Sequence, residues 1–247
     1  MILRPHPAGT LLIGQPAHAW LSGRFADAWA WPYRPRDDVW LAALQHDIGM
    51  AAWDAAPVLD PRTGLPYSFT SMPRAMHVEL WSRAARLMVA QSPYAALLVS
   101  LHGTGLYERY VSEQERRAEP VRGYLESERA WQGGMIAALR ADRDEVERNA
   151  TLLRCWDWLS LFVCTASSEK GLFAEVPAAD GTASLTARMP AGDAEAVTVS
   201  PWPFAVAALE AELDGRLMRG TAATQDELDH AVAAAPIERL RIRLSPG

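Results

Sequence analysis

Histidine and aspartate, which ligate transition metals, recur at apolar positions along the first two thirds of the chain. The stretch LAALQHDIGMAAWD, residues 41 to 54, places His46 beside Asp47 in an otherwise apolar segment. Neighbouring residues on a helix point about 100° apart, so the pair cannot satisfy each other through a three- or four-residue contact. A partner outside the helix must meet them. Either one side chain faces solvent while the other makes a core hydrogen bond, or both bind a metal ion.

Three further histidines extend this pattern. His18, His77 and His102 each fall in a different segment with apolar residues at helical spacing. A single such histidine is more often a hydrogen-bonded structural residue than a ligand, but four on successive helices favour a shared site. His6 lies near the terminus and His230 in a polar segment, so neither is included.

Asp157 is the second notable carboxylate, because it lies between two tryptophans in CWDWLSLFV. Burying an unpaired carboxylate is costly, so Asp157 needs a partner. Solvent, an arginine such as Arg154, and a metal ion are the three alternatives.

The segments that must position these residues are predominantly helical. Apolar spacing predicts six helices, at residues 15–30, 37–53, 74–91, 92–111, 121–142 and 144–166. Proline, glycine and small polar residues between the second and third predict a long loop that could form the lip of a pocket. After residue 168 the pattern indicates strands or hairpins, a turn at Asp214-Gly215 and one short helix. We therefore expect a mainly α helical bundle over residues 1–168 with a small β-rich extension, residues 169–247, packed on it.

Composition limits the class of function. The 247 residues are 49% hydrophobic, which can supply a substantial core, and the net charge of −6 argues against a nucleic-acid partner. No segment resembles a signal peptide or a membrane span, and the two cysteines are too few for a structural zinc site. A cytoplasmic protein acting on a small molecule is expected, with its oligomeric state left open.

The ordered set His18, His46-Asp47, His77, His102 and Asp157 resembles the HD superfamily, whose signature is H…HD…D on a helical bundle. Two-metal members add two histidines between the HD pair and the last aspartate. The resemblance covers about residues 15–166, and QHDIGM is similar to the HDIG stretch of many members. Within that superfamily, the chain looks most like a bacterial family of unknown function.

The resemblance implies a dinuclear centre. His18, His46, Asp47 and Asp157 would hold one ion, Asp47 would bridge to a second, and His77 and His102 would hold that one. Asp47 would thus be the catalytic carboxylate. Mixed imidazole and carboxylate ligands suit two divalent ions of iron, manganese, zinc or nickel, and such a pair can activate a shared water.

The sequence departs from the HD pattern at one position that bears on substrate binding. Met50 stands where many members carry a lysine that binds an anion, so an arginine would have to replace it. Other candidates for contact with substrate are Trp53, Asp54 and Tyr107, for which core packing is an equally good interpretation. The candidate arginines, each also readable as a surface residue, are Arg24, Arg34, Arg36 and Arg74.

Three functions fit these features. The first is a metal-dependent hydrolase that cleaves a small phosphoester with a metal-activated hydroxide. The second is a mixed-valent di-iron oxygenase that cleaves a C–C or C–P bond, as some two-metal HD proteins do. The third is a helical protein that binds metal or a small ligand without catalysis.

Overall fold

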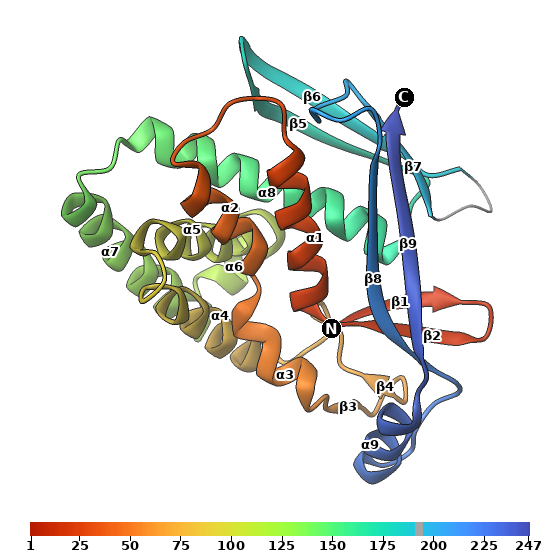
Figure 1. The fold of residues 1–247 in the computed structure, drawn as a ribbon. Coiled ribbons are helices and arrows are strands. Elements are labelled where there is room, and N and C mark those ends of the chain that lie inside the picture. The colour runs from red at the N-terminus through yellow and green to blue at the C-terminus, as the bar shows by residue number, and fades with distance from the viewer. Residues whose placement is uncertain (191–194) are drawn as a thin grey trace.

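A curved seven-stranded sheet forms one side of the molecule and a layer of helices the other (Figure 1). The computed structural model describes residues 1–190 and 195–247. Neighbouring strands are antiparallel except β7 and β9, and the sheet curls into a half-barrel. In spatial order the strands are β1 (Ile2–His6), β2 (Gly9–Ile13), β8 (Leu209–Met218), β9 (Ile237–Pro246), β7 (Ala196–Ser200), β6 (Gly181–Arg188) and β5 (Lys170–Ala178).

Helices α1 to α8 pack in a layer of which α1 and α8 contact the sheet, and α9 lies apart from it at one end of the sheet, against β8 (Figure 1). A hairpin of two very short strands, β3 (Leu59–Asp60) and β4 (Leu65–Pro66), lies within the segment expected to be a loop. The helices of the described residues are α1 (Gln15–Ala28), α2 (Arg36–Gln45), α3 (Ala51–Ala55), α4 (Arg74–Met88), α5 (Pro93–Tyr110), α6 (Glu113–Arg116), α7 (Val121–Leu139), α8 (Arg143–Thr165) and α9 (Gln225–Ala234).

The expectation of a mainly α bundle with a small β-rich extension is wrong, because the structure is α/β with a large mixed sheet. The N-terminal strands β1 and β2 account for part of the error. They are short, and β2 pairs with β8, so the sheet combines both ends of the chain across the expected boundary at residue 168. Arg4 of β1 is buried and donates to the carbonyl of Val163, at 2.6 Å, near the end of α8.

Strands β8 and β9 show the alternation expected of a half-buried pair. Along β8 the buried apolar residues alternate with exposed acidic ones, and the acids face arginines of β9. Arg239 Nε lies 2.9 Å from Asp214 Oδ1 across the two strands. The predicted turn at Asp214-Gly215 is wrong, since both residues lie inside β8. A Cβ at Gly215 would lie 2.8 Å from Leu11 Cδ1, so glycine is needed here because β2 passes close by.

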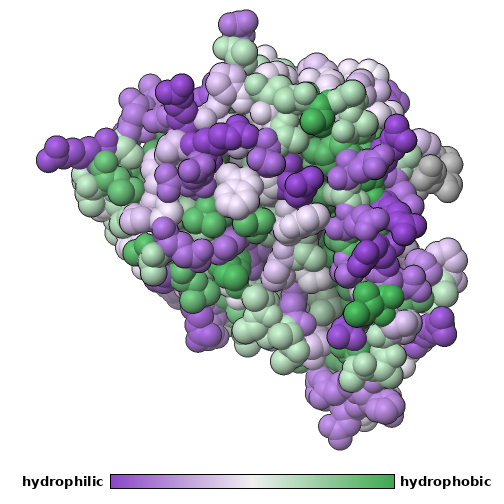
Figure 2. Space-filling view, in the orientation of Figure 1, coloured by the Kyte–Doolittle hydropathy of each residue, from purple (hydrophilic) through white to green (hydrophobic). Residues whose placement is uncertain are grey.

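No helix among the described residues is long and apolar enough to cross a membrane. Figure 2 shows hydrophobic and hydrophilic residues intermixed over the visible face.

The expected helix over residues 37–53 is interrupted at the His-Asp pair. Helix α2 ends at Gln45, His46 caps it, and Asp47 has φ −99° and ψ 17°, outside the helical region. A 3-10 turn at Ile48–Met50 follows, before α3. The break changes the direction of the backbone between two adjacent side chains. This resolves the geometrical difficulty that the pair posed on a continuous helix.

Gly49 allows this turn to lie directly against α4. A Cβ at Gly49 would overlap the Leu80 carbonyl oxygen and lie 3.0 Å from the Ala84 Cβ. Backbone atoms cannot move aside as a flexible side chain can. Glycine is therefore required by the packing of the turn that carries the His-Asp pair.

We expect Gly49→Ala to lower the free energy of unfolding by about 1–3 kcal/mol, the range for overpacking a tight contact. Chemical denaturation with a circular dichroism signal measures it. The matched control is Gly133→Ala in α7, where a Cβ meets nothing within 4 Å and alanine should stabilise the helix by about 0.5–1 kcal/mol. Equal stability of Gly49→Ala and the wild type would contradict this packing account.

Candidate functional site

Four side chains converge at a buried point where α1, α8 and the end of α2 meet. His18 comes from α1, His46 and Asp47 from the break after α2, and Asp157 from α8. His18 Nε2 lies 2.8 Å from Asp47 Oδ2 and 3.5 Å from Asp157 Oδ1. His46 Nε2 lies 3.3 Å from Asp157 Oδ1 and 3.7 Å from Asp47 Oδ2. The four residues thus form one cluster, and both histidines are fully buried.

Ser160 fixes the orientation and tautomer of His18. Its Oγ donates to the main-chain carbonyl of Asp157 at 2.9 Å and lies 2.7 Å from His18 Nδ1. Because the serine proton is already given to a carbonyl, the oxygen accepts from Nδ1–H. In that tautomer, His18 Nε2 presents its lone pair to the cluster, 2.8 Å from Asp47 Oδ2.

The imidazole of His46 is fixed in the same way by its own backbone. His46 Nδ1 lies 2.9 Å from the carbonyl oxygen of Ala43, which can only accept, so Nδ1 carries the proton. His46 Nε2 faces His18 Nε2 at 3.2 Å. In neutral imidazoles these would be two lone pairs directed at each other, with carboxylate oxygens beside them. Such an arrangement requires a positive charge between the two nitrogens.

The separations match the edges of a coordination polyhedron. Two imidazole nitrogens bound to one ion at about 2.1 Å, at angles of about 90–110°, lie roughly 3.0–3.4 Å apart. The nitrogen pair here is 3.2 Å apart, and ligand atoms of His18, His46 and Asp157 all lie within 4.8 Å of one another. The donor set, two imidazoles and two carboxylates, is one that divalent transition metals accept. Ligand atoms of His18, His46 and Asp157 are thus close enough to share one metal ion, and Asp47 Oδ2 borders them at 2.8 Å from His18 Nε2.

The contacts between the histidines and the carboxylates determine which groups of the cluster are charged. Burial disfavours a charged His46, yet Asp47 and Asp157 outweigh it and raise the pKa of His46 to about 9. Burial likewise opposes ionisation of Asp47 and Asp157, but the neighbouring histidines hold the pKa of both carboxyls below the usual range. Without metal, a proton on His46 supplies the positive charge that the two carboxylates need.

His102 of α5 borders the cluster on the other side of Asp157. Its Nε2 lies 3.6 Å from Asp157 Oδ2, and its ring centroid lies 5.0 Å from that of His46. Nδ1 is buried and has no hydrogen-bond partner within residues 1–190 and 195–247. Burial lowers the pKa of His102 to about 4, so the ring is neutral. His102 is thus a neutral donor beside the second oxygen of Asp157.

His77 of α4 is held apart from this cluster. Its Nδ1 lies 2.5 Å from the Tyr107 hydroxyl, and its Nε2 accepts from Trp81 Nε1 at 3.3 Å. Burial, reinforced by the charge of Arg74, lowers the pKa of His77 to about 4. Both ring nitrogens are therefore occupied. Of the six ligands implied by the sequence, five lie together and His77 bonds to aromatic side chains instead.

A cavity of about 580 Å³ opens beside the cluster. Asp157 and His77 both line it, so the buried cluster reaches the cavity through Asp157. Four cationic side chains and a single carboxylate, Asp157, line it among the described residues. The cations come from α4, α5, α8 and the start of β5: Arg74, Arg109, Arg154 and Lys170. In a chain of net charge −6, this concentration of positive charge favours an anionic ligand.

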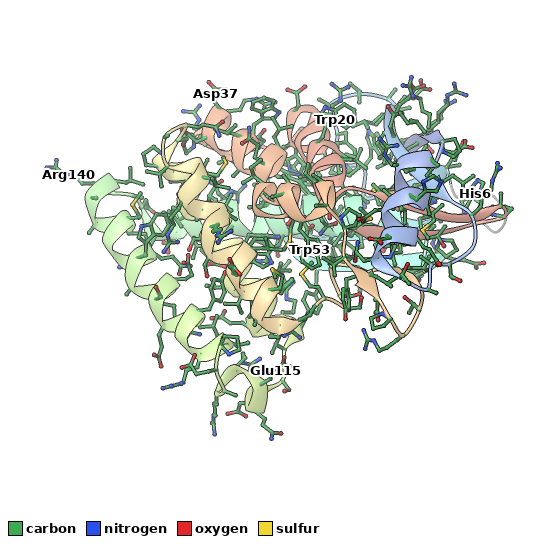
Figure 3. All side chains as sticks on the ribbon, turned by 90° about the horizontal axis from the view of Figure 1, so that it is seen from below. His6, Trp20, Asp37, Trp53, Glu115 and Arg140 are labelled. Atoms are coloured by element: carbon green, nitrogen blue, oxygen red, sulfur yellow. The ribbon has the colours of Figure 1, made fainter. Side chains whose placement is uncertain are left out.

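Of the seven candidate substrate contacts, only Arg74 and Tyr107 line this cavity, among the residues described. Arg74 pairs with Glu115 at 2.7 Å. Asp54 is structural: it accepts from the Gln15 amide and lies 2.7 Å from the Met1 amino group. Trp53 lies near the middle of the molecule as seen from below (Figure 3).

The other arginines considered from the sequence lie elsewhere. Arg24 stacks over Trp20, Arg36 stacks over Tyr33, and the Arg34 carbonyl accepts from Asn149. Trp20 lies at the outer edge of the helical layer in Figure 3.

Sequence reasoning missed Ser160 and the cationic residues Arg109 and Lys170. The spacing of Ser160, three residues after Asp157 on the same helix, places both on one face and is a signal that could have been used. Arg154, considered as a partner of Asp157, instead pairs with Glu147 at 3.0 Å. Lys170, the chain's only lysine, carried no local signal because its neighbours are ordinary strand and loop residues.

Comparison with known proteins gives a family but no activity. The chain matches the family described as "Protein of unknown function (DUF3891)" over residues 1–219. Neither the curated proteins nor the solved structures gave a significant match. The resemblance to the HD superfamily is therefore wrong: the family match is to DUF3891, and the mixed sheet differs from a helical bundle. The hydrolase class thereby loses the support of that resemblance. The chain belongs to the DUF3891 family.

Proposed function

We propose that this chain binds one divalent transition-metal ion between His18, His46, Asp47 and Asp157 and uses it to hydrolyse a small phosphoester. The observation that carries the proposal is the 3.2 Å approach of two imidazole nitrogens whose outer nitrogens are both fixed as donors. A metal ion at their meeting point would turn a repulsive arrangement of lone pairs into four bonds. Iron, manganese, zinc and nickel all accept this donor set.

The proposal is for one ion rather than the two first expected. A second ion beside Asp157 Oδ2 would have His102 as its nearest imidazole ligand. His77 could join it only by breaking its bonds to Tyr107 and Trp81. We therefore leave His102 beside Asp157 Oδ2, outside the four ligands of the first ion.

Cationic residues of the cavity are the reason for proposing a phosphoester as the substrate. A bound ion would supply Lewis acidity and lower the pKa of a coordinated water to about 7. Arg154 lies one turn before Asp157 on α8, and Arg74 of α4 lines the same cavity as Asp157, so two guanidinium groups are available to a ligand there. Guanidinium groups bind phosphate oxygens through paired hydrogen bonds. The phosphate would be held between these arginines and the cluster.

We expect untagged protein, purified without chelator, to contain about one transition-metal ion per chain, measured by elemental mass spectrometry. Asp157→Asn keeps the size of the side chain but removes its charge, and should lower the metal content at least tenfold. Asp214→Asn, on the exposed face of β8, is the matched control and should keep it. Equal metal content in the two variants, with unchanged thermal stability, would contradict the site.

We expect Ser160→Ala to weaken metal binding by about 10–100-fold, the usual effect of losing a group that orients a ligating histidine. Titration with a competing chelator measures the affinity. Thr165→Ala is the control, because Thr165 lies on the same helix and its hydroxyl donates to the Leu161 carbonyl at 2.8 Å. An affinity within twofold of wild type for Ser160→Ala would show that the hydrogen bond to His18 does not prepare the site.

We expect hydrolysis of 4-nitrophenyl phosphate that is lost on chelation and restored by metal. Arg154→Gln should lower kcat/KM by about 10–100-fold, because a charge-assisted hydrogen bond to the phosphate contributes about 1.5–3 kcal/mol. Arg143→Gln, an exposed arginine at the start of α8, is the control.

Two results would overturn the proposal, and a third would remove Arg154 from it. Iron-dependent activity that requires dioxygen would favour the oxygenase instead. Metal binding without turnover of any phosphoester would favour a non-catalytic role. Equal kcat/KM for Arg154→Gln and the wild type would remove Arg154 from the site.

A further inference from the structure

The cavity beside the cluster has two chemically different parts. The buried part holds Asp157, His77 and the partly buried Arg154, whose Nε has no hydrogen-bond partner in the described part of the chain. Beyond it, the walls are aromatic: Phe69 from the segment before α4, Trp158 and Phe162 from α8, and Phe173 from β5. A ligand bound only through its charge would not need an aromatic surface.

The aromatic side chains form a continuous wall. Ring centroids of Trp158 and Phe162 lie 6.2 Å apart, and those of Trp158 and Phe173 lie 5.7 Å apart. Arg109 lies over Phe173, 5.9 Å from its ring centroid, and so adds a cation to the edge of this wall. Within the described residues, neither Arg109 nor Lys170 forms an ion pair with a carboxylate. Flat apolar rings bordered by cations suit an aromatic body attached to an anion.

The dimensions agree with such a ligand. A cavity of about 580 Å³ far exceeds what a bare phosphate needs, and lies within the roughly 300–1,000 Å³ of pockets that enclose organic ligands. The anionic head would face Arg154, at the end of the cavity that carries the polar groups. The body would lie on the rings of Trp158 and Phe173.

We propose that the substrate is an aromatic compound carrying one anionic phosphate-like head, selected by the aromatic wall as much as by its charge. This inference rests on the proposed function for the position of the head group. It deepens that function by naming the class of compound that the cavity accepts.

Gly105 of α5 offers a way to test the cavity itself. It lines the cavity, and a Cβ there would lie 3.8 Å from Arg154 Cδ, an ordinary contact. A larger side chain at this helical position would therefore extend into the cavity without displacing backbone. Gly133 of α7, with nothing within 4 Å of its Cβ position, provides a matched site outside the cavity.

The experiment is isothermal titration calorimetry of the full chain with phenylphosphonate, methylphosphonate and benzyl alcohol, none of which is a phosphoester. Phenylphosphonate should bind at least about tenfold more tightly than either of the others, since burying a phenyl ring is worth at least about 1.4 kcal/mol. Gly105→Leu should weaken its binding at least tenfold, whereas Gly133→Leu should leave it within twofold. Thermal melts of both variants verify folding.

Any of three other results would overturn the inference. Similar affinities for phenylphosphonate and methylphosphonate would exclude selection by the aromatic wall, and equal binding of benzyl alcohol would exclude selection by charge. Unchanged binding by folded Gly105→Leu would place the ligand elsewhere. Assays of metal-supplemented protein separate the two proposals: selective binding of phenylphosphonate without turnover of any phosphoester would leave this inference standing while the proposed function fails. Phosphoester turnover without selectivity would do the reverse.

Discussion

Two imidazole nitrogens facing each other at 3.2 Å in a buried centre are the constraint on which the site depends. The rings cannot turn away, because Ser160 holds one and the Ala43 carbonyl holds the other. Two carboxylates, Asp47 and Asp157, complete the centre, and burying them uncompensated would cost several kcal/mol per ion. A cation among the four groups removes both penalties. Any ion that binds only the folded chain would also stabilise it.

The fold serves this centre by bringing distant segments together. The break after α2 turns His46 and Asp47 toward one point, and Gly49 lets the following turn lie against the α4 backbone. Helix α8 carries Asp157 and Ser160 on one face and also packs against β1 and β5 of the sheet. Because β5 starts directly beside α8, the sheet supplies part of the cavity wall as well as support for the helices.

The sequence predicted the helices better than the sheet, for physical reasons. Long amphipathic segments such as α5 and α8 have a period that can be recognised locally. Strands β1 and β2 have five residues each, and β8, with which β2 pairs, lies some two hundred positions later, so nothing local reveals that pairing. The same limit applies to the site. His18, His46, Asp47, His102 and Asp157 were identifiable by residue type, whereas the diversion of His77 to Tyr107 depends on tertiary packing. Lys170 begins β5 in the region where strands were expected, but its place beside the cavity depends on how the sheet packs against α8.

The most direct test of this account is an anomalous diffraction map of crystals of the protein grown without chelator, collected at the absorption edge of the metal it contains. The account predicts one peak at about 2.0–2.2 Å from the Nε2 atoms of both His18 and His46, with Asp47 and Asp157 oxygens completing the coordination. A map without a peak in metal-supplemented crystals, with the two rings held in their present orientation, would contradict it. So would a peak bound by His77 and His102 but not by His18 and His46.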